Sequence, residues 1–261
     1  FLYCQTLVVG AAMRFYEYMQ APGIDVLTQY NYEYDNAKQC QSALYQTGRK
    51  WMLSELYGCT GWDLSFEGHK AVGDWQAALG VTLRCHHLSW YTMKGEAKRD
   101  YPASISFQSP WWRHYRFVED YFSRVNVALT EGGEPVQKLL VIHPIESMFA
   151  RFRPRILDHD NPDKFMLGHL QPDVAELNNM LPTLRDWLLE AHLDFAYGDE
   201  EMMSRLAAVD AASSPRLRVG QATYDAVLVP PLDTVRRSTL ALLADFAKAG
   251  GRVVFTGDPA P

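Results

Sequence analysis

Residues 50–63, KWMLSELYGCTGWD, begin as an apolar β-strand, place a carboxylate near the strand's end and continue into a glycine-containing loop. We expect the strand over Lys50–Tyr57 and the loop over Gly58–Trp62. Ser65 then supplies a good N-cap for a following helix. This strand–loop–helix order is the unit from which parallel α/β folds are built.

The same alternation extends through the rest of the chain in both directions. Further strands are expected at residues 24–30, 81–87, 139–143, 193–197, 224–231 and 252–256. Helices are expected at residues 11–20, 36–48 and 111–129, after Ser65 as far as Gly80, around Leu181–Leu188, and over a segment that includes Val235, Leu242 and Phe246. Strands that alternate with helices predict parallel sheets, and the fold class is therefore α/β.

Two segments stand outside this alternation. Residues 93–110 form a long polar loop, which suggests a functional rim, and residues 151–180 read as loop-rich. Gly132 and Gly133 break the chain and predict a junction between two domains, residues 1–132 and residues 136–261.

The composition bounds the class of protein. The 261 residues are 48% hydrophobic and 21% charged, which is ordinary globular composition. The net charge of −6 without a basic stripe argues against nucleic-acid binding, and no apolar run is long enough to span a membrane. Aromatic residues reach 13%, and because sugar rings stack on aromatic rings this weakly favours a carbohydrate site.

The four cysteines show no CxxC spacing, so we expect free buried thiols rather than a metal site or disulfides. This leaves the compartment open, with a preference for the cytoplasm, although a longer parent protein would also be compatible with secretion or the periplasm. The first residues lack an initiator methionine and a signal-peptide pattern, and both ends are expected to be cut from a longer protein.

Glu55 is the sharpest candidate for chemistry. In parallel folds the reacting groups lie where strands end, and three expected strands end in the polar or aromatic segments 30–35, 54–57 and 86–91. A carboxylate at the end of an apolar strand suits glycosidic cleavage, which uses two carboxylates. A glutamate that caps the loop N–H groups fits the spacing equally well, so both interpretations stay open.

Other side chains near these strand ends are weaker candidates. Glu33 and Asp35 would supply a second carboxylate, a sugar contact or a metal ligand, but a solvated loop is the simpler interpretation. His87 would bond a sugar hydroxyl or orient Glu55, or else be structural. Five aromatic residues are candidate stacking platforms, of which about two are expected to touch substrate: Trp62, Trp90, Tyr91, Trp111 and Trp112.

Two further features bear on a metal site and on a nucleotide or amidotransferase site. Asp158, His159 and Asp160 can bind metals, but their spacing matches no standard site, so no metal is assigned. The second half has no glycine-rich phosphate loop after its first strand, and no cysteine follows Cys85. A nucleotide site and an amidotransferase nucleophile are therefore not expected there.

The sequence resembles a known group of enzymes at a set of short motifs. They are Met13–Met19, Pro22–Asp25, Leu53–Gly58, Gly61–Asp63, His87, Trp90–Tyr91, Pro110–Trp112 and Pro144–Glu146. Together they resemble large bacterial glycoside hydrolases of the α-L-rhamnosidase type and barrel enzymes near the β-galactosidases. The resemblance runs over most of the chain and is strongest between Met13 and Phe149.

The resemblance implies the closing part of a catalytic (β/α)₈ TIM barrel over residues 1–132. It implies a flavodoxin-like, class I glutamine amidotransferase-like parallel-sheet domain over residues 136–261. The strands at 24–30, 50–57 and 81–87 would be barrel strands six to eight. Glu55 then matches the second catalytic glutamate, which follows strand seven, and the partner acid would lie upstream of residue 1.

The sequence thus predicts a bacterial enzyme of carbohydrate metabolism that hydrolyses O-glycosyl bonds. Glu55 is expected to be the nucleophile or general base, and the list of substrate contacts is His87, Tyr91, Trp62, Trp90, Trp112 and Glu33. No cofactor is expected, and any homo-oligomer would form through the flavodoxin-like domain. The alternatives are a non-catalytic carbohydrate-binding or assembly protein and an enzyme that binds a nucleotide in its second half.

Overall fold

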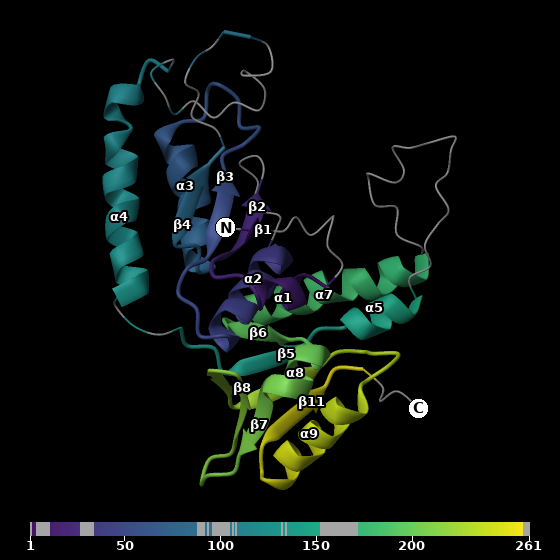
Figure 1. The fold of residues 1–261 in the computed structure, drawn as a ribbon. Helices are drawn as coiled ribbons and strands as arrows, with labels where there is room; N and C mark the ends of the chain where they lie inside the picture. The colour runs from purple at the N-terminus through teal and green to yellow at the C-terminus, as the bar shows by residue number, and fades with distance from the viewer. Residues whose placement is uncertain are drawn as a thin grey trace. The chain divides into compact units, whose positions relative to one another are not determined.

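The computed structural model divides the chain into two compact units, Phe1–Pro135 and Val136–Pro261 (Figure 1). The residues that it describes are 2–3, 11–26, 34–87, 92, 94–95, 105, 107, 109–131, 133, 135–151 and 172–257. Among these, none of the helices has the length and apolar character needed to cross a bilayer.

The first unit is built on a four-stranded sheet whose strands are all parallel. The strands lie in the order β1 (Leu2–Tyr3), β2 (Pro22–Val26), β3 (Leu53–Leu56) and β4 (Leu83–His86). The register places Asp25 opposite Glu55 and Glu55 opposite Cys85. Paired residues of neighbouring parallel strands point to the same face, so these three side chains form one row across the sheet.

Helices connect these strands, as the sequence pattern predicts. They are α1 (Ala12–Tyr16), α2 (Tyr34–Gln46), α3 (Phe66–Ala78) and α4 (Arg116–Glu131), with a short 3₁₀ turn, η2 (Trp112–His114), before α4. Leu56 packs with Val72 of α3 in one buried cluster, which identifies the helix-covered face of the sheet. Asp25, Glu55 and Cys85 alternate with residues of that face and therefore lie on the opposite one.

The helix boundaries follow from local signals. The Ser65 side chain accepts a hydrogen bond from the Gly68 N–H at 3.1 Å and caps α3, as expected. Gly80, at φ +93°, ends the same helix in the left-handed region. The first helix is shorter than the expected span 11–20, and Pro22, expected to end it, instead begins β2.

The second unit has its own four-stranded parallel sheet. The strands lie in the order β11 (Arg252–Phe255), β10 (Ala226–Val229), β5 (Leu139–Ile142) and β6 (Phe195–Gly198). The helices of this unit are α5 (Ile145–Arg151), α7 (Pro172–Glu190), α8 (Glu200–Leu206) and α9 (Arg237–Lys248). The α/β class with parallel sheets is therefore confirmed for both units.

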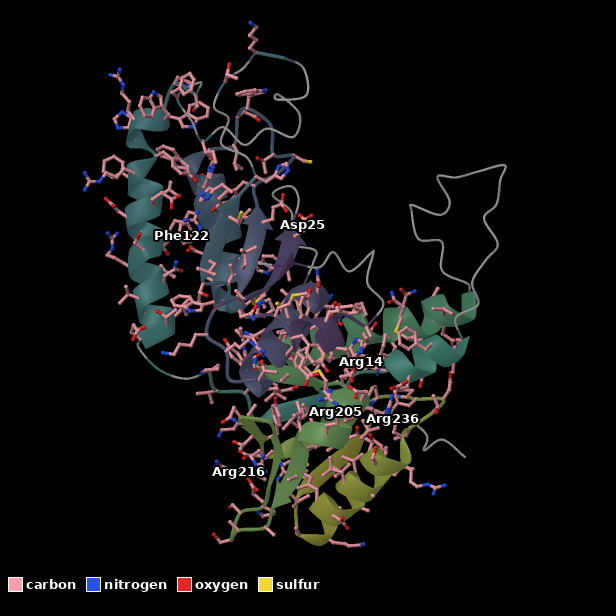
Figure 2. The ribbon with its side chains drawn as sticks, in the orientation of Figure 1. Arg14, Asp25, Phe122, Arg205, Arg216 and Arg236 are labelled. Carbon is pink, nitrogen blue, oxygen red and sulfur yellow. The ribbon has the colours of Figure 1, made fainter. Side chains whose placement is uncertain are left out.

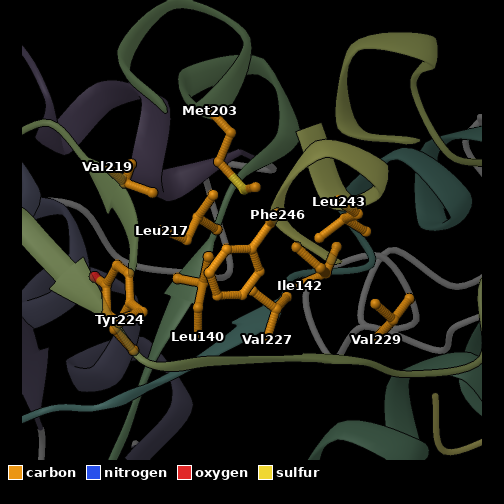
Figure 3. Packing of buried hydrophobic residues seen from close by; sticks show 11 residues of the cluster. Leu140, Ile142, Met203, Leu217, Val219, Tyr224, Val227, Val229, Leu243 and Phe246 are labelled. Carbon is orange, nitrogen blue, oxygen red and sulfur yellow. The ribbon is translucent and has the colours of Figure 1, made fainter. Parts of the chain in front are cut away.

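A continuous apolar core stabilises the second unit. Phe246 of α9 is fully buried against residues of the parallel sheet, including Leu140 and Val227 (Figure 3). Leu217 and Val219 enter the same cluster from a second, smaller sheet. The core thus joins the two sheets of this unit to its last helix.

That smaller sheet corrects the expectation of parallel strands alone. The strands β7 (Ala207–Asp210), β8 (Arg216–Val219) and β9 (Ala222–Tyr224) pair antiparallel in this order. Gly220, at φ +57°, lies in the two-residue turn between β8 and β9, where a left-handed backbone is required.

The segment expected to be loop-rich over residues 151–180 is also corrected in part. From Pro172 onward it belongs to α7, which continues through Pro182. Leu181, Leu184 and Leu188 are buried on one face of this helix, as expected, but Trp187 is 63% exposed.

Candidate functional site

A carboxylate–imidazole pair lies on the face of the first sheet opposite to α3. The Nε2 atom of His87 is 3.3 Å from the Oε1 atom of Glu55, and their side chains are only 19% and 14% exposed. Glu55 is the third residue of β3, and His87 directly follows β4. The His87 N–H donates to the Leu56 carbonyl at 2.9 Å, which continues the pairing of the two strands and holds the imidazole beside the carboxylate.

A second carboxylate lies one strand away. Asp25 of β2 occupies the position opposite Glu55, and its strand lies between β1 and β3 (Figure 2). The sequence analysis did not single out Asp25. An aspartate inside the otherwise apolar run 22–26 was the signal that could have found it, by the argument already applied to Glu55.

Two thiols flank these carboxylates. Burial, and then the nearby charge of Asp25, raise the pKa of the Cys59 thiol, while burial and then Glu55 raise the pKa of Cys85. Both thiols are therefore protonated near neutral pH, and a thiol is a poor nucleophile and metal ligand. Cys40, Cys59 and Cys85 are free thiols, but of these only Cys40 is buried as expected, while Cys59 is partly buried and Cys85 is exposed.

The backbone immediately after Glu55 takes an uncommon conformation. Tyr57 has φ +70° and Cys59 has φ +59°, so two non-glycine residues within four positions of Glu55 are left-handed. Such backbone is disfavoured for residues with a Cβ atom and clusters at functional sites. The strain thus points independently to the loop that begins at this carboxylate.

The opposite, helix-covered face carries a partly buried polar network. Arg84 of β4 donates to the Tyr57 hydroxyl at 2.7 Å and to Glu119 of α4 at 3.1 Å. His86 and Glu119 are joined by a bond of 3.0 Å between Nε2 and Oε1. Burial raises the pKa of Glu119, but the His86 bond and the Arg84 charge outweigh it and lower that pKa overall. Glu119 is therefore ionised at neutral pH.

The remaining side chains that the sequence predicted as substrate contacts lie apart from this pair in sequence. Trp62 lies on the loop after β3 and is 41% exposed, and Trp112 precedes α4 and is 44% exposed. Exposed indole faces of this kind can stack on a sugar ring. Glu33, Trp90 and Tyr91 lie outside the described residues, so the structure brings together only Glu55 and His87 from the predicted list.

No metal centre is assembled within the described residues, where no group of three potential ligands was found. Asp35 lies in the first turn of α2. Asp158, His159 and Asp160 fall outside the described part of the chain.

In the second unit, the protein's own side chains bond to one another at the sheet edge where an open parallel sheet would bind a nucleotide. In such sheets ligands bind beyond the carboxyl ends of the strands at the point where the strand order reverses, here between β5 and β10. At this edge Arg236 donates to Glu146 at 2.7 Å, and Ser147 accepts the N–H groups of Asp233 and Thr234 at 3.0 and 3.2 Å. The protein's own side chains therefore join the segments that follow β5 and β10.

Comparisons with known proteins identify the fold at a distance. A catalytic mutant of a glycoside hydrolase family 42 β-galactosidase from G. stearothermophilus superposes with a TM-score of 0.54 at 10% identity. A cold-adapted β-galactosidase from Rahnella sp. R3 gives the same TM-score at 14% identity. No protein-family model matches the chain, and neither does any curated protein.

These matches cover both units of the chain but only part of each enzyme. They include 93% of this chain and 33% or 34% of the two β-galactosidases. The chain thus spans about a third of the length of the structures that it matches. At these identities the comparison shows a glycoside-hydrolase-like fold alone.

Proposed function

We propose that this chain is the closing part of a glycoside hydrolase that cleaves O-glycosyl bonds. Residues 1–132 form the last strands and helices of a (β/α)₈ barrel, and residues 136–261 form a flavodoxin-like domain. The β-galactosidase-like fold supports this assignment. The observation that carries the function is the Glu55–His87 pair, because it places a carboxylate at the strand ends where barrel enzymes hold their reacting groups.

Glu55 acts on the anomeric carbon of the sugar. As a nucleophile, its carboxylate forms the new bond to that carbon while the glycosidic C–O bond breaks; as a general base, it takes a proton from the water that attacks instead. In either case the leaving oxygen takes a proton from a partner acid. His87 holds the carboxylate through its 3.3 Å contact and limits its rotation.

The substrate is an oligosaccharide or polysaccharide of plant or bacterial origin. Trp62, exposed on the loop after β3, is positioned to stack on a sugar ring, and Trp112 and the aromatic segment Trp90–Tyr91 are further candidates. The second unit has a structural role and carries any contacts between copies of the protein. The ion pairs at its strand ends favour this structural role over a nucleotide site.

The rival function is a carbohydrate-binding or assembly protein that keeps the barrel shape without catalysis. The exposed tryptophans favour it as much as they favour an enzyme, because stacking serves binding alone equally well. The two functions differ in whether Glu55 is needed for turnover, so they are separable by one substitution.

The test replaces Glu55 by Gln in the full-length protein and assays aryl glycosides. Glu67→Gln is the matched control, because Glu67 is an exposed carboxylate in the first turn of α3. We expect turnover to fall at least about a hundredfold in Glu55→Gln, with sugar binding retained, and to be unchanged in the control. Equal turnover in wild type and Glu55→Gln sinks the catalytic assignment. Sugar binding without any wild-type turnover favours the rival.

A further inference from the structure

The conformation of Tyr57 changes which face of the sheet its side chain occupies. In a regular strand, side chains alternate, so the residue two positions after Glu55 would point to the same face as Glu55. Tyr57 instead has φ +70° and is fully buried against α3, its ring centroid 4.6 Å from that of His69. Leu56 and Tyr57 therefore both lie on the helix-covered side.

This reversal keeps a large ring away from the carboxylate. With ordinary strand geometry, the Tyr57 ring would stand beside Glu55 on the face opposite to α3, at the carboxyl end where a substrate would approach. The left-handed backbone removes it and begins the loop Gly58–Trp62, in which Cys59 is also left-handed. Nothing in a tyrosine favours this backbone, so other contacts must hold it.

Two hydrogen bonds fix the Tyr57 side chain in this position. The Tyr57 hydroxyl donates to the His69 carbonyl at 2.9 Å and accepts from Arg84 at 2.7 Å. Burial raises the pKa of Tyr57 to about 12, so the hydroxyl keeps the proton that it donates. One anchor comes from the helix after β3 and the other from the next strand of the sheet.

Arg84 is itself fixed by α4. Its guanidinium is 3.1 Å from Glu119, and its side chain is only 7% exposed. It also lies 3.8 Å from the centre of the Phe122 ring, on the side of α4 that meets the sheet (Figure 2). An Arg so held has one orientation, and this fixes the position of the Tyr57 hydroxyl.

We propose that Tyr57 is a positioning residue for Glu55, held by Arg84 and Glu119, which keeps the approach to the carboxylate open and sets the path of the Gly58–Trp62 loop. This inference rests on the proposed function of Glu55. It assigns to α4, far from the reacting groups in sequence, a part in shaping the site.

The test compares Tyr57→Phe with Tyr16→Phe in the full-length protein. Both changes remove one hydroxyl from a fully buried tyrosine of the first unit, but Tyr16 bonds Asn36 at 3.0 Å, away from β3. We expect Tyr57→Phe to lower kcat about tenfold with KM within about twofold, because the carboxylate is misplaced rather than the sugar unbound. Tyr16→Phe leaves both constants unchanged.

A second readout does not need catalysis. Alkylation of Cys59, followed by mass spectrometry, reports the freedom of the loop that Tyr57 begins, with buried Cys40 as internal reference. Loss of the anchor should accelerate labelling of Cys59 about fivefold in Tyr57→Phe and leave it unchanged in Tyr16→Phe.

The outcomes separate this inference from the proposed function. A kcat loss and faster Cys59 labelling confined to Tyr57→Phe support it. If the two variants behave alike in both readouts, Tyr57 is merely a packing residue and the inference is wrong. Wild-type protein without turnover refutes the proposed function by itself. In that case the labelling result alone tests whether the loop depends on Tyr57. Equal labelling of Cys59 in Tyr57→Phe and Tyr16→Phe shows that it does not.

Discussion

Acidification should destabilise the first unit through His69. This residue of α3 is fully buried, and its Nδ1 atom donates to the Ser65 carbonyl at 2.9 Å. The bond assigns the neutral tautomer, and the buried Nε2 atom has no hydrogen-bond partner among the described residues. Protonation would place a new N–H donor there without an acceptor.

The size of the effect follows from the pKa of His69. Burial is the main cause that lowers it from 6.5 to about 4. The unfolded chain therefore binds a proton more readily than the folded chain, so stability rises with pH and is lost as pH falls from about 6.5 toward 4. At about pH 5 the loss amounts to about 2 kcal/mol, and it reaches a limit of about 3 kcal/mol below pH 4.

The neighbouring carboxylate of Glu119 acts in a different pH window. His86, Arg84 and Glu119 lie on the elements packed against His69, and the pKa of Glu119 is lowered. Its contribution is present above its unfolded pKa and is lost as pH falls through its folded pKa, below the ordinary glutamate value. It therefore adds little between about pH 7.5 and pH 5.

The assay measures the free energy of unfolding by urea at about pH 7.5 and about pH 5, with tryptophan fluorescence as the signal. His69→Gln removes the titration and keeps a donor that can reach Ser65, and His114→Gln is the control because His114 is exposed. Between the two pH values wild type should lose about 2 kcal/mol more than His69→Gln. An identical pH dependence in these two proteins would refute the reasoning.

Three further substitutions test the packing. A methyl group at Gly73 would lie 2.1 Å from the Phe122 ring, so Gly73→Ala should lower stability by about 1–2 kcal/mol despite a better helix propensity. In a Phe122→Leu background the same change should be neutral or stabilising. If the loss of stability persists in that background, the clash with Phe122 is not its cause. Leu217→Ala in the second core should cost about 2–5 kcal/mol in urea unfolding, against less than about 0.5 kcal/mol for exposed Leu240→Ala. Ser65→Ala should cost about 1 kcal/mol and speed hydrogen exchange in the first turn of α3; unchanged exchange would mean that the cap is not used.

Much of the fold was predictable because its signals are local. The apolar run that ends at Glu55, the Ser65 cap and the Gly80 stop lie within one strand–helix unit, and each acts through its own backbone neighbours. The antiparallel sheet of the second unit was missed for the opposite reason. Its strands are three or four residues long, and their burial depends on contacts with Leu140 and Phe246 that sequence separation conceals.

The sequence identified two residues of the candidate site, but it did not reveal the contacts that hold the loop beside them. The strand ends predicted one rim for Glu55 and His87, with contact between the two side chains as one of several alternatives. The structure places them 3.3 Å apart, while their chemical role stays a prediction. The left-handed backbone of Tyr57 could not be predicted, because tyrosine disfavours it and the bonds that hold it come from distant residues. Asp25 was missed because the expected strand over residues 24–30 placed it near the start of the strand, whereas β2 spans Pro22–Val26 and has Asp25 next to its last residue.

The measurement that tests the central claim most directly is rescue of Glu55→Ala by azide in the full-length protein. The substitution removes the carboxylate and leaves space at the anomeric carbon, where azide can attack as the aryloxide departs. If Glu55 is the nucleophile or general base, turnover of an activated aryl glycoside should be lost and should return with azide, giving a glycosyl azide. If Glu55→Ala turns over the substrate at the wild-type rate without azide, or if azide does not restore its lost turnover, the assignment of Glu55 is contradicted.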